Sequence, residues 1–115
     1  MMRIPKDAME KAIKRMADRL DKLSKYSNFS LQFNLIDMGT SWYIRTGENG
    51  KVVEFSEGKI ENPTFEFTGF SEDFYNVLTG RTSLRSEVET VGRIEMKSSV
   101  KMDNEVYAKY IDIFE

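Results

Sequence analysis

The chain has 115 residues, a length that suits one domain spanning residues 1–115, and its net charge of −2 gives it no electrostatic footprint for nucleic acid. It contains neither cysteine nor histidine, which excludes disulfides, thiolate chemistry and the side chain most often used as a metal ligand or general base. No apolar run approaches the roughly 18 residues of a membrane span, and the composition favours the reducing cytoplasm.

Residues 5–25 form the first predicted element, an amphipathic helix. Its apolar side chains recur at spacings of four and three residues, which places them on one face: Met9, Ile13, Met16, Leu20 and Leu23. Residues 1–25 carry a net charge of +4, and the remaining ninety carry −6. The basic helix is either a solvated face crossed by ion pairs or a docking surface for anionic lipid headgroups, which high salt would weaken.

Four strands are predicted after this helix. Apolar and polar residues alternate over residues 29–35, which is typical of a strand with one wet face. Residues 41–46 and 52–55 continue the pattern on either side of a glycine-rich turn at residues 47–50, and residues 64–68 alternate again. The first three strands, joined by short turns, indicate an antiparallel meander.

The second half is predicted to combine short helices with one more strand. Ser71 is expected to cap a short helix, and the apolar spacing within residues 84–91 indicates another. A strand over residues 93–97 precedes a last helix, which Asp103 caps and which carries Phe114. Because strands and helices are largely segregated along the chain, the fold class is α+β with an antiparallel or mixed sheet.

The last helix carries apolar residues around much of its circumference, because these residues do not fit one narrow stripe: Val106, Tyr107, Tyr110, Ile111 and Phe114. Two interpretations follow. The helix either docks permanently on the core or acts as a lid that lifts from an apolar cavity. The eight phenylalanines and seven methionines suit a packed core and a pocket for a flexible apolar ligand equally well.

The order and spacing of several motifs resemble one known family. A tryptophan-bearing strand at residues 41–44 precedes a glycine-rich turn, and a short strand at residues 64–68 leads into residues 71–74. Residues 78–81 and 91–96 complete the pattern. In this arrangement the chain from Phe29 to Phe114, roughly three-quarters of its length, resembles the sterol carrier protein type 2 domain.

The resemblance implies a five-stranded, mostly antiparallel sheet covered by helices that enclose an apolar tunnel. It also implies non-catalytic binding and transfer of a hydrophobic ligand (a fatty acid, fatty acyl-CoA, sterol or isoprenoid-like lipid), with the C-terminal helix as the gate. Because an apolar tunnel separates such ligands poorly, promiscuity within a size class is expected. Carried onto this sequence, the tunnel would be lined by Phe33, Trp42, Phe65, Phe67, Phe74, Leu78, Leu84, Val88, Ile94, Met96, Met102, Val106, Tyr110 and Phe114.

Polar residues near the tunnel would orient the ligand headgroup, and the candidates are Gln32, Asn34, Tyr43, Tyr107 and Tyr110. No cofactor and no metal site are predicted, because the sequence contains no metal-ligand spacing. The expected partners are the lipid, transiently an anionic membrane surface, and a second copy of the chain that covers the apolar lid in a homodimer. Nucleic acid is not an expected partner.

Two other functions stay open. An enzyme is disfavoured because the chain has no nucleophile–base pair and no phosphate-binding loop, while adjacent acids such as Glu72 and Asp73 are explained by helix capping or solvation. The main alternative is a protein-interaction or accessory module of a lipid or quinone pathway, with the tunnel partly filled by side chains. Saturable uptake of lipid by delipidated protein would separate the carrier from this module.

Overall fold

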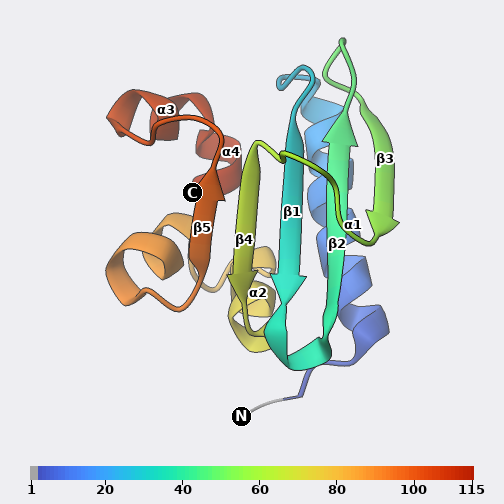
Figure 1. Ribbon diagram of the computed structural model, residues 1–115, viewed down its shortest axis with the longest axis vertical. Coiled ribbons are helices and arrows are strands. Elements are labelled where there is room, and N and C mark those ends of the chain that lie inside the picture. Colours follow the sequence, from blue (N-terminus) through green and yellow to red (C-terminus); the bar gives the residue numbers. More distant parts are fainter. Residues whose placement is uncertain (1–2) are drawn as a thin grey trace.

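The longest helix, α1 (Lys6–Leu23), packs across one face of the sheet in the computed structural model, which describes residues 3–115 (Figure 1). Pro5 precedes the helix in an extended conformation, so the helix starts one residue later than predicted. Six side chains of its apolar face are buried: Met9, Ala12, Ile13, Met16, Ala17 and Leu20. The predicted stripe is therefore confirmed except at Leu23, the last residue of the helix, which is 43% exposed. Among the helices of residues 3–115, none combines the length and hydropathy that a bilayer span requires.

The sheet has five strands in the order β3-β2-β1-β4-β5. Its strands are β1 (Ser30–Leu35), β2 (Thr40–Thr46), β3 (Val52–Glu57), β4 (Phe65–Gly69) and β5 (Glu95–Ser98). The first three strands form the predicted antiparallel meander, and β5 is antiparallel to β4. Strands β1 and β4 pair in parallel, so the sheet is mixed and mostly antiparallel, as the resemblance implied.

Two tight connections hold the meander. A single turn of 3-10 helix, η1 (Ile36–Met38), and Gly39 join β1 to β2. The next turn contains Gly50, whose φ is +79°. A Cβ atom at this position would lie 2.5 Å from the backbone carbonyl of Ser24, so only glycine lets the turn approach the end of α1. The backbone N–H of Val52 donates to the Asp21 carboxylate, 2.9 Å away, and this bond fixes β3 against α1.

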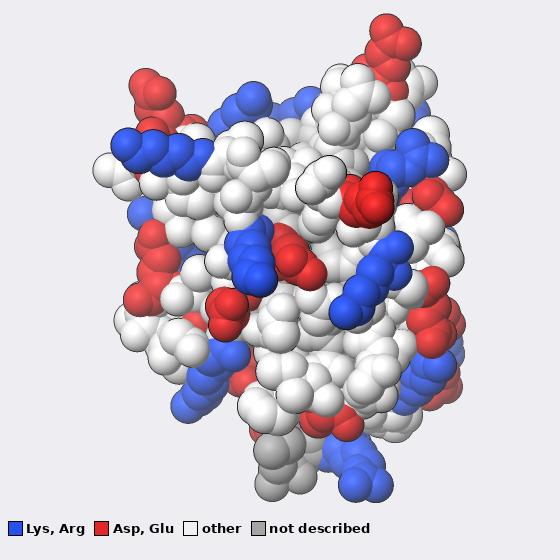
Figure 2. Space-filling view, viewed as in Figure 1, with Lys and Arg blue, Asp and Glu red and all other residues white. Residues whose placement is uncertain are grey.

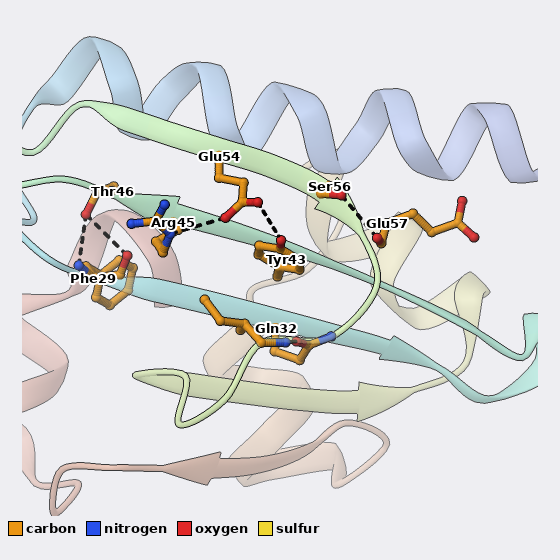
Figure 3. A network of polar contacts seen from close by, with 9 residues as sticks. Phe29, Gln32, Tyr43, Arg45, Thr46, Glu54, Ser56 and Glu57 are labelled. Carbon is orange, nitrogen blue, oxygen red and sulfur yellow. Dashed lines mark hydrogen bonds and ion pairs between the residues drawn. The ribbon is translucent and has the colours of Figure 1, made fainter.

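The face of the sheet that points away from α1 is polar. On it, the Tyr43 hydroxyl donates to one Glu54 oxygen at 2.7 Å, and Arg45 Nε donates to the other at 3.2 Å (Figure 3). The loop between β3 and β4 crosses this face. Gln32 holds the loop there, because its amide donates to the Gly58 carbonyl at 3.0 Å and accepts from the Ile60 N–H at 2.9 Å.

Charged residues on this polar face alternate in sign. Figure 2, viewed from the same side as Figure 1, shows Lys and Arg interspersed with Asp and Glu across this face, its centre included. In Figure 1, α1 and α2 (Ser71–Leu78) lie behind the sheet, and α3 (Asn104–Lys109) lies beside its β5 edge. The apolar interior therefore lies between the far face of the sheet and the helices.

The second half contains α2 (Ser71–Leu78), η2 (Ser86–Val91), α3 (Asn104–Lys109) and α4 (Ile111–Phe114). Residues 84–91 are helical as predicted, although η2 itself is a π-helix, a form that the apolar spacing did not indicate. The predicted last helix is in fact two helices that meet at Tyr110, whose φ of −106° and ψ of 30° interrupt the regular backbone.

The two predicted helix caps have opposite outcomes. Asp103 caps α3 as expected, because its carboxylate accepts from the Val106 N–H at 2.9 Å. The cap assigned to Ser71 is wrong, because Ser71 is the first residue of α2 and Phe70 occupies the cap position. The Ser71 hydroxyl instead donates to the Asp37 carboxylate at 2.6 Å, and this bond joins α2 to the β1–β2 connection.

Candidate ligand-binding site

The fourteen residues predicted to line a tunnel all belong to one apolar region between the sheet and the helices. Five of them are partly buried and pack against the central cluster: Leu78, Val88, Met96, Met102 and Val106. The other nine are buried members of that cluster: Phe33, Trp42, Phe65, Phe67, Phe74, Leu84, Ile94, Tyr110 and Phe114. The sequence therefore places these side chains on the correct side of the sheet, and their contact with a ligand stays a prediction.

Aromatic rings form a continuous row on the inner face of the sheet. The ring centroids of Phe33 and Phe67 are 5.9 Å apart, and those of Phe67 and Phe65 are 6.2 Å apart. Two rings from the C-terminal helices cover this row. Phe114 lies edge-on to Phe65 at 5.1 Å, and Tyr110 lies edge-on to Phe65 at 5.0 Å. The rings that cover β4 thus come from α4 and from the junction between α3 and α4.

A group of polar contacts, here called the C-terminal latch, holds α4 from outside. Asp112 is its centre. Lys25 Nζ lies 3.0 Å from the Asp112 carboxylate, the Tyr26 hydroxyl donates to the same oxygen at 3.1 Å, and Arg19 donates to the Asp112 backbone carbonyl. The hydrogen bond from Lys25 lowers the pKa of Asp112, so the carboxylate is charged at neutral pH. The latch is exposed at its rim, because 47% of the Lys25 side chain is accessible.

Arg85 makes the second attachment of the C-terminal helices. Its guanidinium lies 4.2 Å from the ring centre of Tyr107, and its Nη1 lies 3.3 Å from a Glu115 oxygen. Arg85 also pairs with Glu89, one turn further along, at 3.1 Å. Burial and the nearby Glu89 carboxylate raise the pKa of Tyr107 to about 12, so its hydroxyl is neutral over the physiological range.

A cleft of about 480 Å³ opens beside this interior, between α1, the end of α2 and α4. Its polar rim includes Arg15 and Arg19 of α1, together with Thr82 and Ser83. Its floor is apolar and includes Met16, Val77, Leu78, Leu84 and Ile113. Sequence reasoning found only Leu78 and Leu84 in this group. The sequence did indicate that Arg15 and Arg19 lie on the same side of the predicted helix, because they are four residues apart.

Three of the predicted headgroup-orienting residues lie outside this interior. Gln32, Asn34 and Tyr43 point to the polar face of the sheet, where the Asn34 amide donates to a Glu66 oxygen at 2.9 Å. Their assignment as headgroup ligands is wrong, because neighbours of inward-facing strand residues point to the opposite face. Tyr107 and Tyr110 do lie on the interior side, where both are buried.

A buried acidic residue lies within η2 and does not line the cleft. Glu87 is 4% exposed, and its Oε2 has no hydrogen-bond partner among residues 3–115. Burial, and then the negative charge of Asp73, raise the pKa of Glu87, while Arg93 acts in the opposite direction. No group of three potential ligand side chains that could hold a metal ion occurs in the described part of the chain.

The match to a protein family covers most of this architecture. Residues 9–90 match the SCP-2 sterol transfer family, a range that includes most of α1, the meander, β4, α2 and most of η2. The chain belongs to the SCP-2 sterol transfer family. The family resemblance of the sequence is thereby confirmed, and membership supports lipid binding and transfer as the general class of function. No curated protein sequence matches the chain.

Solved structures with the SCP-2 fold support the same architecture. Sterol carrier protein 2 like 2 from Aedes aegypti is 20% identical, with a TM-score of 0.61 over 91% of this chain and 94% of that one. The ubiquinone synthesis protein UbiJ-SCP2 is 13% identical, with a TM-score of 0.58 over 94% of each chain. A mutant of the secondary alkylsulfatase PisA1 is 11% identical, with a TM-score of 0.68 over 97% of this chain.

The SCP-2 chain described here spans only 16% of the alkylsulfatase, so the fold in that enzyme is one part of a much longer protein. At identities of 20% and below, these likenesses show the shared α+β fold. The fold occurs both alone, over nearly the whole of the Aedes aegypti protein, and inside an enzyme.

Proposed function

We propose that this SCP-2 domain binds and transfers a single-chain hydrophobic ligand without catalysis, and that the C-terminal helices α3 and α4 gate its interior. The observation that carries the proposal is the difference between the inner and outer contacts of α4. Inside, Phe114 and Tyr110 cover the aromatic row of β4. Outside, α4 is attached through Asp112 and Glu115 in partly exposed polar contacts, which are individually weak in water.

Displacement of the Phe114 and Tyr110 rings would expose an apolar surface on which an acyl chain could be buried. Each buried CH₂ group of a ligand contributes about 0.8 kcal/mol, and a long acyl chain therefore gains on the order of 10 kcal/mol. The loss of ligand freedom and the displaced Phe114 and Tyr110 contacts take back several kcal/mol. A dissociation constant near micromolar is the expected result.

The test is a titration of delipidated protein with a fluorescent fatty acid, followed by native mass spectrometry of the complex. Saturable uptake of one ligand per chain, with quenching of the fully buried Trp42, supports a carrier. Linear, non-saturating partition of the probe, with no mass increment on the folded protein, contradicts it. Phe114→Ala provides an internal check, because removal of a ring over β4 should strengthen uptake.

A second candidate is an accessory module whose interior stays filled by its own side chains. Two observations favour it. The inner rings already contact one another, with Phe33, Phe67 and Phe114 in one cluster, and large apolar residues are exposed elsewhere, including Phe70 at 40% and Val91 at 46%. The likeness to a ubiquinone synthesis protein is consistent with this role. The same titration decides, because the module would take up no ligand.

Membrane contact is a further part of the proposed carrier function. Arg15, on the rim of the cleft, and Lys22, near the end of α1, are exposed and make no ion pair within residues 3–115. Leu23, next to Lys22, is 43% exposed. This combination fits a transient contact with an anionic surface. Flotation with phosphatidylserine vesicles should show binding that high salt abolishes and that neutral vesicles do not give. A homodimer and a cytoplasmic location stay predictions.

A further inference from the structure

A second pocket, of about 670 Å³, lies where the first turn of α2 faces the segment that follows η2. Both segments contribute to its lining: Phe70, Glu72, Asp73, Asn76, Gly92 and Arg93. It shares no lining residue with the cleft beside α4. Its volume falls within the range of roughly 300–1,000 Å³ that binding pockets occupy, so a ligand group can enter it.

Negative charge exceeds positive charge in this second pocket. Two acids, Glu72 and Asp73, belong to its lining, and Arg93 is the one cation among the lining residues within 3–115. Arg93 is attached loosely, because its Nη1 lies 3.9 Å from Asp73 Oδ1, beyond hydrogen-bond distance, and 64% of its side chain is exposed. Burial raises the pKa of Asp73 although Arg93 acts in the opposite direction. The arginine of the pocket therefore leaves its acids incompletely neutralised.

Glu87 gives an independent indication of a ligand. It is 4% exposed, and its Oε2 accepts no hydrogen bond within residues 3–115. The two charged side chains that act on its carboxyl group, Asp73 and Arg93, both line the second pocket, so the carboxyl group lies on the pocket side of η2. Helix capping accounts for acids in the first turn of α2, but it does not account for a buried carboxylate without a donor, which costs stability. Such a group on a π-helix is typical of a functional site.

The cation that suits these carboxylates is organic. No three potential ligand side chains in the described part of the chain converge on a metal position, so a metal ion does not fit. A guanidinium fits better than an ammonium group, because its N–H donors form a planar fork that can bond to two carboxylates at once. Asp73 and Glu87 supply these two carboxylates.

Exposed apolar residues surround the pocket. Phe70 forms part of its wall and is 40% exposed, and Val91 at the end of η2 is 46% exposed. Ile36, which is 57% exposed, lies at the same edge of the sheet as Phe70, because the two residues follow the paired Leu35 and Gly69 of the parallel strands β1 and β4 (Figure 1). A free cation would fill the pocket alone, whereas a protein segment would also cover this apolar surface.

We propose that the second pocket binds an arginine side chain of another protein: the guanidinium bridges Asp73 and Glu87 in place of Arg93, and an apolar neighbour of that arginine packs on Phe70. The partner cation compensates the buried charge of Glu87, while Arg93 moves into solvent, where most of its side chain already lies. The inference goes beyond the carrier function and does not depend on it, because neither carboxylate lines the cleft beside α4.

The first experiment compares an arginine peptide with its neutral counterpart. Wild type is titrated with acetylated and amidated Ala-Leu-Arg-Leu-Ala, and with the same peptide carrying citrulline in place of arginine, while amide chemical shifts are followed by NMR. Citrulline keeps the shape of the side chain and removes its charge. The arginine peptide should shift the amides of residues 70–76 and 92–93 saturably and bind about tenfold more tightly than the citrulline peptide.

The second experiment removes one carboxylate at a time. Glu87→Gln and Asp73→Asn should each weaken binding of the arginine peptide about tenfold and leave the citrulline peptide unaffected. Glu89→Gln is the matched control, because Glu89 lies on the same π-helix, pairs with Arg85 at 3.1 Å and does not line the pocket. Thermal unfolding should show Glu87→Gln to be at least as stable as wild type, so that its weaker binding does not come from unfolding. If it is less stable, Asp73→Asn decides.

Each result has a definite meaning. A wild type that binds both peptides equally, or neither of them saturably, overturns the inference, and so does an Asp73→Asn variant that keeps the preference for arginine. Agmatine, a free guanidinium compound, serves as a third ligand, and binding of agmatine as tight as that of the arginine peptide overturns the choice of a protein partner. A homodimer in sedimentation velocity that Asp73→Asn dissociates would identify a second copy of the chain as the occupant and overturn the choice of a different protein.

Discussion

The helix α1 and the C-terminal helices both cover the sheet with buried side chains, yet their backbones are supported differently. α1 is one continuous helix of 18 residues. α3 and α4 have six and four residues, too few for a stable isolated helix, and they bury Tyr107, Tyr110, Ile113 and Phe114. Burial of a side chain therefore does not by itself fix the helix that carries it. Short helices held by rings and a polar latch can open locally while the rest stays folded.

The largest expected difference is between the sheet under α1 and the C-terminal helices, when each receives the same substitution. Phe33 of β1 and Phe114 of α4 are 1% and 0% exposed, so Phe→Ala removes equal volume from a buried site in both cases. Phe33→Ala should cost about 3–5 kcal/mol in the free energy of unfolding, measured by urea denaturation. Phe114→Ala should cost about 1–2 kcal/mol, because local opening of α4 already separates that ring from the cooperative core.

Trp42 reports global unfolding of both variants, since it is fully buried in β2. It pairs with Phe33 across β1 and β2, so the signal of the folded state is measured separately for each variant. The two variants should have the same urea m-value as wild type if global unfolding exposes the same surface. Equal losses of stability for Phe33→Ala and Phe114→Ala would mean that α4 unfolds only with the core, and the contrast between the two regions would then be wrong.

A smaller effect is expected in η2, which lies in the second half of the chain but outside the C-terminal helices. Glu87 has a raised pKa because of its burial and the charge of Asp73, so its protonated form is favoured in the folded state. The stability it supports is therefore fully present below its ordinary pKa of 4.5 and is lost as the pH rises through the folded value.

Glu87→Gln keeps the shape of the side chain and removes its charge, so the variant does not lose stability as the pH rises. The variant should be more stable than wild type by about 1 kcal/mol at pH 7, and the difference should shrink toward pH 4. Thermal unfolding at several pH values measures it, and Glu89→Gln, which lies two residues away and is paired with Arg85, should instead be neutral or destabilising. A destabilised Glu87→Gln would show that the charge of Glu87 is needed.

The smallest effect is expected at the latch. Because Lys25 lowers the pKa of Asp112, the stabilisation from this carboxylate is present above its ordinary value of 3.8 and is lost as the pH falls through the folded value. Asp112→Asn should thus raise hydrogen exchange in α4 at neutral pH and leave Trp42 unfolding almost unchanged. Wild type and variant should converge in acid.

Asp18→Asn is the matched control for the latch, since Asp18 pairs with Lys14 on the open surface of α1 at 2.9 Å. It should change exchange in α4 at no pH. If Asp112→Asn destabilises the core as much as it loosens α4, the latch belongs to the cooperative fold and does not act as a local fastening.

Most of the fold was predictable because its patterns are local. The spacing of apolar residues predicts both the helix α1 and the alternation in β1 to β4. Asp103 caps α3 through a bond to Val106, which is only three residues further along the chain. Ser71 was misassigned because its hydroxyl contacts Asp37, which is 34 residues away in the sequence. The break at Tyr110 and the π-helix η2 depend on tertiary packing, which a single apolar pattern does not encode.

The apolar part of the candidate site was predicted better than its polar part. Inward-facing residues such as Phe65 and Phe67 follow from alternation, and the family resemblance assigned them a common location. Arg15 and Arg19 were read only as part of a basic helix, because the cleft depends on where α2 and α4 end in space. The prediction placed Gln32 and Asn34 at a ligand headgroup because both are polar. Their side chains instead make contacts on the polar face of the sheet, because residues that alternate with inward-facing ones point to the opposite side.

The parallel pairing of β1 with β4 has a consequence for synthesis of the chain on the ribosome. The meander of β1 to β3 can form once residue 57 has emerged, but its edge at β1 then lacks a neighbour until Phe65–Gly69 has followed and the intervening loop has closed. During this interval an unpaired strand edge and the apolar side chains of β1 are open to other nascent chains. Conditions that slow translation between residues 58 and 69 should therefore increase aggregation of newly made protein.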